Sequence, residues 1–183
     1  MNASIFSLTN PEIYVVTAAY EGQRGGQVAT WVTLAAIIPE QLRVIVIISP
    51  RNFTYRLMQQ SGAFVLNLLA EGQQDWLPLF GLQSMHEVNK FSDIPAQTTE
   101  SGIPILPETC GWALCETLQT FDLGDRVVFL ADVVAQEVTG ARQPLRRIEA
   151  TAALSPEINA QLVAKRLLDI EADRKLRQEN PRP

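Results

Sequence analysis

The sequence predicts a mainly β protein whose strands form a closed or partly closed antiparallel barrel, with short inserted helices and a C-terminal helix. Several strand-length runs rich in β-branched residues follow one another, and helical periodicity between them is confined to short segments. No G-x-G-x-x-G pattern follows a strand. A layered βαβ fold would need longer helices between its strands and, for a dinucleotide, that glycine pattern.

The composition is that of one ordered globular domain. Of the 183 residues, 46% are hydrophobic and 19% are charged, whereas a disordered chain carries more charge and fewer branched apolar residues. The formal net charge is −5. This balance provides no positive field that would gather phosphate backbones, so we expect no nucleic-acid partner.

The potential metal ligands are few. Cys110 and Cys115 are the only cysteines and His86 is the only histidine, too few for an ordinary four-ligand zinc site. We expect the cysteines to be small apolar strand residues and His86 to be a solvated loop side chain. The chain begins without a basic segment or a long apolar run, so we expect no membrane partner and a cytoplasmic location.

Three strands are predicted to open the domain. Residues 13–20 are β-branched, aromatic or small, and the glycine-bearing segment 21–26 is typical of a reversing loop. A return strand is predicted over 27–36, and Pro39 follows it as a breaker. Residues 42–48 form a nearly continuous apolar run, which is typical of a strand buried on both faces.

Short helices and a further strand are predicted next. Asn52 is placed to cap a helix over 53–60, and the apolar run 63–69 predicts another strand. A second helical stretch is predicted over 73–82. The segment 84–107 is polar, contains prolines and is too long for a simple connection, so it is a candidate binding loop or lid.

A second hairpin and a helix complete the predicted fold. Alternating residues predict strands over 112–121 and 126–137, and Ser155 followed by Pro156 predicts a helix start. The helix has an apolar stripe formed by Ile158, Leu162, Val163, Leu167 and Ile170. We therefore divide the chain into a barrel domain over 1–153 and a C-terminal helix with a polar tail over 154–183.

The junction between the third strand and the first helix favours an anionic ligand. Free backbone N–H groups and the positive end of the helix dipole converge there. Ser49, Asn52 and Thr54 add hydroxyl or amide donors, and Arg51 adds a positive charge. A phosphorylated cofactor fits this junction, but the same residues also describe an ordinary capped helix with a solvated arginine.

A series of short motifs occurs in a fixed order along the chain. They are Ile13 to Ala18, Ala29 to Thr33 with Pro39 downstream, Asn52 with Thr54, Ser61 to Leu69, Lys90-Phe91, Gly102 to Leu106, Ala113 to Glu116, and Gly124-Asp125-Arg126. This order resembles that of the flavin reductase-like, FMN-binding split-barrel family from about Ile13 to Val138. The resemblance implies an antiparallel split β-barrel of the FMN-binding type.

The resemblance also implies where the cofactor FMN is bound. The flavin ring is expected at one strand segment, the phosphate at the strand-to-helix junction, and two residues are expected to approach from the lid loop. The residues concerned are, in that order, Ala29, Thr30, Trp31, Val32 and Thr33; Ser49, Arg51, Asn52 and Thr54; and Lys90 and Phe91. No catalytic side chain and no metal are expected, because hydride transfer is the flavin's own chemistry.

Departures from the family pattern leave the reductant open. Val28 and Ala36 stand where relatives commonly have hydroxyl residues, so ring contacts would come from the backbone or from Thr30 and Thr33. The usual Gly-Asp-His motif ends in Arg126 here, and that histidine is associated with the side where the nicotinamide approaches. Arg126 is therefore expected to bind a pyridine-nucleotide phosphate or an acidic partner, or to be a surface charge.

The leading functional hypothesis is an NAD(P)H-dependent FMN oxidoreductase of the flavin reductase type. The alternatives are an FMN-bearing electron carrier that a protein partner reduces, without a nicotinamide site, and a barrel that has lost its flavin. We also expect a homodimer, because a split barrel leaves open sheet edges. The stripe on the C-terminal helix would be buried either against a second copy or against its own barrel.

Overall fold

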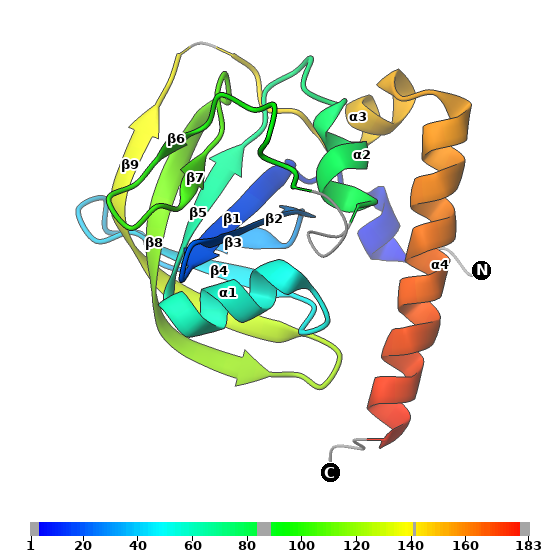
Figure 1. Cartoon of the computed structure of the whole chain (residues 1–183). Helices are drawn as coiled ribbons and strands as arrows, with labels where there is room; N and C mark the ends of the chain where they lie inside the picture. Colours follow the sequence, from blue (N-terminus) through cyan, green and yellow to red (C-terminus); the bar gives the residue numbers. More distant parts are fainter. Residues whose placement is uncertain (1–3, 84–88, 141, 180–183) are drawn as a thin grey trace.

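The structure is a computed structural model that describes residues 4–83, 89–140 and 142–179. Within these residues, a seven-stranded antiparallel sheet curls into a half-barrel with the strand order β2-β1-β5-β8-β9-β4-β3 (Figure 1). The strands are β1 (Tyr14–Tyr20), β2 (Gln23–Ala29), β3 (Val32–Leu34), β4 (Arg43–Ile48), β5 (Ala63–Leu68), β8 (Gly111–Asp122) and β9 (Val127–Val138). The predicted fold class is confirmed.

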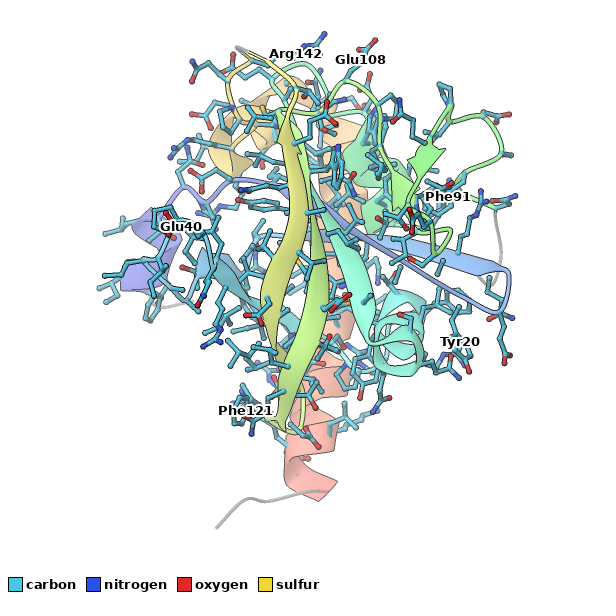
Figure 2. All side chains as sticks on the ribbon, turned by 90° about the vertical axis from the view of Figure 1, so that its left-hand side faces the viewer. Tyr20, Glu40, Phe91, Glu108, Phe121 and Arg142 are labelled. Carbon is cyan, nitrogen blue, oxygen red and sulfur yellow. The ribbon has the colours of Figure 1, made fainter. Side chains whose placement is uncertain are left out.

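The helices lie around the sheet, as Figure 1 shows. They are the 3-10 helix η1 (Ile5–Leu8), α1 (Phe53–Ser61), α2 (Trp76–Gly81), α3 (Arg147–Ala153) and α4 (Pro156–Glu179). A small hairpin, β6 (Gln97–Thr98) and β7 (Pro104–Ile105), lies beside the sheet. The longest pairing joins β8 to β9, with Phe121 near the turn at one end and Arg142 and Glu108 beyond the other (Figure 2).

The main core lies between the curled sheet and α1. Phe64 and Phe129 are fully buried and meet edge to face with ring centroids 6.2 Å apart. Helix α1 adds Leu57 and Met58 to the same cluster. Because side chains alternate between the two faces of a strand, one face of the curled sheet is buried. Leu57 and Met58 of α1 cover that face.

The first hairpin is tighter than predicted, because only Glu21 and Gly22 form the turn and β2 already begins at Gln23. The expected loop over 21–26 is wrong. Gly25 and Gly26 serve close packing within the strand: a Cβ on Gly25 would lie 2.9 Å from Leu57 Cδ1, and one on Gly26 would lie 2.7 Å from Phe80 Cε1. Glycine is needed at these two positions because side chains of α1 and α2 pack closely against the strand, and not because the chain turns there.

The predicted return strand over 27–36 is also interrupted. Strand β2 ends at Ala29, and β3 at the opposite edge of the sheet pairs with β4. Only Thr30 and Trp31 connect β2 to β3. The chain therefore crosses from one edge of the curled sheet to the other at these two residues. Strand β4 alternates between buried and half-buried residues, so it is not buried on both faces as its composition predicted.

The segment predicted as a lid contains more structure than expected. The hairpin β6–β7 lies within it, and Lys90 and Phe91 are buried. His86 lies outside the described residues. Helix α2 is shorter than the predicted stretch 73–82.

The C-terminal region has two helices where one was predicted. The unpredicted helix α3 precedes α4, which runs alongside the barrel (Figure 1). Of the predicted apolar stripe, Ile158 and Leu162 pack in cis against a cluster around α2, whereas Val163 and Leu167 are exposed. None of the helices in the described ranges is long and apolar enough to cross a lipid bilayer.

Candidate functional site

The strand-to-helix junction has the predicted local structure. After β4 ends, the N–H of Asn52 donates to the carbonyl of Ser49 at 3.2 Å, and the N–H of Arg51 lies 3.4 Å from the Ser49 hydroxyl. Asn52 stands at the N-cap of α1, but its side chain makes no capping hydrogen bond. The helix start therefore has no side-chain cap from Asn52, and the positive end of a helix dipole favours an anion.

Strand β2 lies directly against the first turn of α1. Thr54 is buried, and its Oγ1 is 3.1 Å from the point where a Cβ on Gly25 would stand. Gln27 follows on the same face of β2. Its Oε1 is buried without a hydrogen-bond partner, as is Oγ1 of Thr117, among the residues that the structure describes. A buried acceptor without a donor is costly, so Gln27 marks a position that suits a ligand N–H or O–H.

Lys90 is a buried cation on the other face of β2, and not a solvated loop lysine. It is 5% exposed, its Nζ donates to the carbonyl of Gly26 at 3.1 Å, and it lies 5.5 Å from the ring centroid of Phe80. Burial lowers the pKa of Lys90 to about 8, with a smaller contribution from the positive charge of Lys165. Phe91, its neighbour, packs in the cluster around α2.

Two arginines from distant parts of the chain meet at one carboxylate of α4. Nη2 of Arg51 lies 2.9 Å from Oδ1 of Asp173, and Nη2 of Arg126 lies 2.7 Å from Oδ2. Arg51 also reaches Asp169 at 3.3 Å. The Arg126 guanidinium lies 5.6 Å from the ring centroid of Trp31. Arg126 is therefore not an isolated surface charge, which was one of the alternatives for it.

A further ion pair joins α4 to the β8–β9 turn. Nε of Arg177 lies 2.8 Å from Oδ1 of Asp125. Burial raises the pKa of the Asp125 carboxyl, but the hydrogen bond from Arg177, a backbone hydrogen bond and the positive charges of Arg177 and Arg126 together outweigh burial and lower it overall. Both partners of this pair are consequently charged at neutral pH.

The structure thus links most of the predicted site residues through a continuous chain of contacts. Trp31 contacts Arg126, Arg126 shares Asp173 with Arg51, and the α1 terminus with Thr54 meets β2 beside Lys90. The side chains of two predicted residues pack in the protein interior: Ala29 is part of the main core, and Phe91 is part of the cluster around α2. Thr30 and Val32 are half-buried at the edge crossing, and Thr33 is exposed on β3.

Sequence reasoning missed the α4 residues that meet this site. Lys165, Asp169, Asp173 and Arg177 recur every four residues, which places them on one face of a helix. The charge spacing was visible in the sequence. The spacing alone does not say which partner this face of the helix meets.

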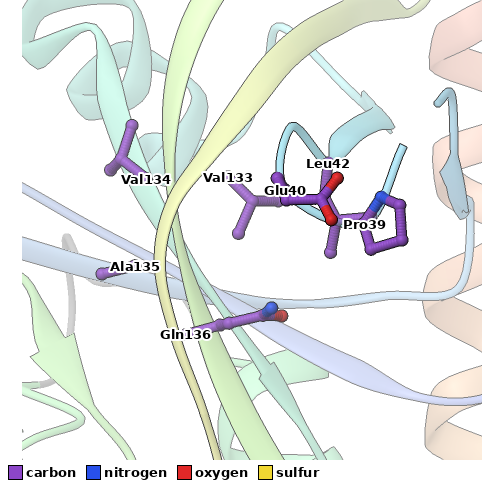
Figure 3. Close-up of a pocket in the computed structure, with 7 residues that line it drawn as sticks. All are labelled: Pro39, Glu40, Leu42, Val133, Val134, Ala135 and Gln136. Atoms are coloured by element: carbon purple, nitrogen blue, oxygen red, sulfur yellow. The ribbon is translucent and has the colours of Figure 1, made fainter. Parts of the chain in front are cut away.

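A pocket opens elsewhere, between the β3–β4 connection and β9 (Figure 3). Its lining comprises Pro39, Glu40, Leu42, Val133, Val134, Ala135 and Gln136. An adjoining, more apolar groove is lined by Leu34, Ala35, Ala36 and Ile37 together with Pro39, Leu42 and Gln136. Ala36 and Pro39, which belong to the segment that the resemblance associates with the flavin ring, line the groove, whereas Ser49, Arg51, Asn52 and Thr54 of the junction line neither hollow.

The curled antiparallel sheet defines the class of protein as a split β-barrel of the kind found in FMN-binding proteins. The family model described as flavin reductase like domain matches residues 7–148. The chain belongs to this family.

Two curated relatives differ in how much of them the chain spans. A ferric-chelate reductase (NAD(P)H) of Archaeoglobus fulgidus is 24% identical over 140 residues, which is 75% of this chain and 82% of the relative. Diflavin flavoprotein A 1 of Synechocystis sp. is 28% identical over 130 residues, which is 70% of this chain but 22% of the relative. The chain therefore matches most of the first protein and about a fifth of the second.

Solved structures show the same fold. An FMN-binding protein from Thermus thermophilus with bound p-hydroxybenzaldehyde has a TM-score of 0.68 and 26% identity, covering 76% of this chain and 78% of the other. The NADH:FAD oxidoreductase of Streptomyces globisporus C-1027 has a TM-score of 0.69 at 19% identity, covering 75% and 81%. The second likeness concerns the fold alone.

Proposed function

We propose that this protein binds FMN and transfers electrons to it from NAD(P)H. One observation carries the proposal: Arg51 stands just before the N-terminus of α1, and its guanidinium meets that of Arg126 at one carboxylate, that of Asp173. Helix N-termini and arginine pairs both bind phosphate. In a family whose members handle flavins, this junction is the best-equipped position for a flavin phosphate.

The donor set of the described residues fits such a cofactor. Thr54 and backbone N–H groups of α1 would donate hydrogen bonds to the phosphate oxygens, together with Ser49, Asn52 and Arg51. The unsatisfied Oε1 of Gln27 would accept a hydrogen bond from a ring or ribityl group. When bound, the flavin itself supplies the hydride and electron chemistry, and these residues hold and orient it.

FMN is proposed as the flavin because two guanidiniums that share one carboxylate suit a single phosphate, whereas FAD carries a second phosphate and an adenosine. The binding experiment includes both flavins. A cytoplasmic location and the division of the chain at residue 153 are parts of the same proposal.

The test is a flavin titration of the protein with FMN, riboflavin and FAD, followed by anaerobic mixing with NADH and with NADPH. FMN should bind more tightly than riboflavin, and one nicotinamide should bleach the flavin. The double variant Arg51→Ala with Asn52→Ala should weaken FMN binding by roughly 10- to 100-fold, since charge-assisted hydrogen bonds contribute about 1.5–3 kcal/mol.

The matched control is Arg142→Ala. This exposed arginine lies beside Glu108, beyond the opposite end of the β8–β9 ribbon from Arg126 (Figure 2). It should leave FMN affinity unchanged. A folded double variant with unchanged FMN affinity would place the phosphate elsewhere.

A second candidate function is an FMN-bearing electron carrier that a protein partner reduces. Arg126 favours it, because this residue replaces the family histidine and its guanidinium is held by Asp173 and Trp31. A stable yellow protein that neither nicotinamide bleaches would select the carrier. Absence of flavin binding would select a barrel without its cofactor.

We also propose a homodimer, in which the face around the β3–β4 connection contacts a second copy. Ile37 is 97% exposed and Leu34 is 63% exposed, and both line the same groove. Isolated exposed apolar residues are ordinary, but a contiguous group beside an edge strand indicates an interface. Light scattering should give a dimer for the wild-type chain and a monomer for Ile37→Asp; a monomeric wild type would contradict the proposal.

A further inference from the structure

Helix α4 meets the barrel in two different ways along its length. We call residues 156–164 the anchor, because Ile158 and Leu162 pack there against the cluster around α2. We call residues 165–179 the clasp. Its inward face carries Lys165, Asp169, Asp173 and Arg177, and ion pairs join the last three to the barrel.

We propose that the clasp is detachable and that its Asp173 carboxylate holds Arg51 and Arg126 in the place of an anionic ligand, so that α4 and a flavin phosphate compete. This inference rests on the proposed function. It goes beyond it by assigning to α4 the control of access to the phosphate position.

The geometry at Asp173 is that of an occupied anion site. Each oxygen of the carboxylate faces a different guanidinium, at 2.9 Å from Arg51 and 2.7 Å from Arg126. These arginines come from the loop before α1 and from the β8–β9 turn. Two guanidiniums so placed repel each other unless an anion lies between them. The same converging donors suit a phosphate, which offers more oxygens and nearly two negative charges.

The contacts of the clasp are of the replaceable kind. The Arg51 and Asp169 side chains are 34% and 37% exposed, and an ion pair at that exposure contributes little to stability. The Asp173 carboxylate is 12% exposed, so its two arginines need another anion in its place when the clasp leaves. Apolar packing adds little in the clasp, because Leu167 and Leu168 face solvent and Ile170 is only half-buried. Lys165 stands close enough to Lys90 to lower the pKa of that buried amine, which makes the docked position of the clasp less favourable.

The consequence is a threshold for ligand binding. With the clasp docked, Asp173 keeps the two arginines in position but neutralises part of their charge. A ligand without phosphate gains nothing by displacing it. A phosphorylated flavin gains both guanidiniums, so its binding should free the clasp while the anchor stays in place.

The test compares Asp173→Asn with the control Glu171→Gln in the full-length protein. Both changes remove one negative charge from α4, but Glu171 pairs with Arg174 of the same helix and not with the barrel. FMN and riboflavin affinities are measured by flavin fluorescence. Amide hydrogen exchange is measured over residues 165–177, and in β1 and β8 to show that the barrel is intact.

Asp173→Asn should bind FMN about tenfold more tightly than wild type, while riboflavin affinity and the Glu171→Gln protein stay unchanged. In wild type, FMN should speed amide exchange in the clasp and riboflavin should not. An Asp173→Asn protein with equal or weaker FMN affinity, or slower exchange in the clasp on FMN binding, overturns the inference alone. A wild-type protein that binds neither flavin contradicts the proposed function and this inference with it.

Discussion

The anchor and the clasp are parts of one uninterrupted helix, yet different forces hold them to the barrel. The anchor buries Leu162 and Ile158 on a cluster that includes Phe80 and Leu77. The clasp aligns charges with Arg51, Arg126 and Asp125. The strength of an apolar contact depends little on dissolved ions, because it is non-directional and involves no charge. An ion pair is weakened by salt, and either partner can bind a competing ion instead. The anchor can therefore stay packed on the barrel while the clasp of the same helix is released.

The largest effect is expected beneath the anchor, at Gly26→Ala. The added Cβ would lie 2.7 Å from Cε1 of Phe80, so the ring on which the anchor cluster rests must move. Overpacking of this kind should lower the free energy of unfolding by about 2 kcal/mol, and Tm by roughly 4–8 °C. Calorimetry measures both.

The control for Gly26 is Gly81→Ala in α2. A Cβ there would be 3.4 Å from Cδ2 of Leu162, at ordinary contact distance. Alanine also has the higher helix propensity, so this variant should be neutral or slightly stabilising. Equal losses in the two variants would contradict the steric account of Gly26.

Leu162→Ala tests the anchor itself. Leu162 is half-buried, so the loss should be about 1 kcal/mol, below the range for fully buried leucines. The loss should be the same at low and high NaCl in urea unfolding, because an apolar contact is being removed. Leu168→Ala, at an exposed position of the same helix, should leave the free energy of unfolding unchanged. A loss at Leu162 that depends on salt would contradict the distinction between anchor and clasp.

The pH dependence of stability should report the cation that lies near the boundary between anchor and clasp. Burial lowers the pKa of Lys90 from 10.5 to about 8. Between these values the unfolded chain binds more protons than the folded one, so the free energy of unfolding rises with pH. The rise should be on the order of 1 kcal/mol between about pH 8 and pH 10. Lys90→Met should abolish it; an unchanged slope would mean that Lys90 titrates normally.

The smallest effect should be that of salt on the clasp. Raising NaCl from about 0.05 M to about 0.5 M shortens the screening length severalfold. Amide exchange over 165–177 should then quicken by an amount equivalent to a few tenths of a kcal/mol, while exchange in 156–164 stays constant. Equal acceleration in both segments would show that α4 detaches as one unit.

Much of the fold was predictable from local patterns. The strand runs, the helix after Asn52 and the final helix starting at Pro156 all occur close to where periodicity placed them. The prediction of a loop at Gly25 and Gly26 was wrong. Glycine is required there by side chains more than 25 residues away in the sequence, and a local pattern does not reveal such contacts. The junction at Ser49 to Thr54 could be recognised because helix-terminus chemistry is local; that it holds a flavin phosphate stays a prediction.

The sequence by itself determined which segments are strands, which residues carry charge and where backbone donors are left over at a helix start, because these properties depend on neighbours along the chain. Only the tertiary structure decided that Arg51 and Arg126 share one carboxylate, that Lys90 is buried, and that α4 turns its charged face inward. Those facts depend on the curl of the sheet and on where a long helix comes to rest. Both are set by the summed packing of residues far apart in sequence.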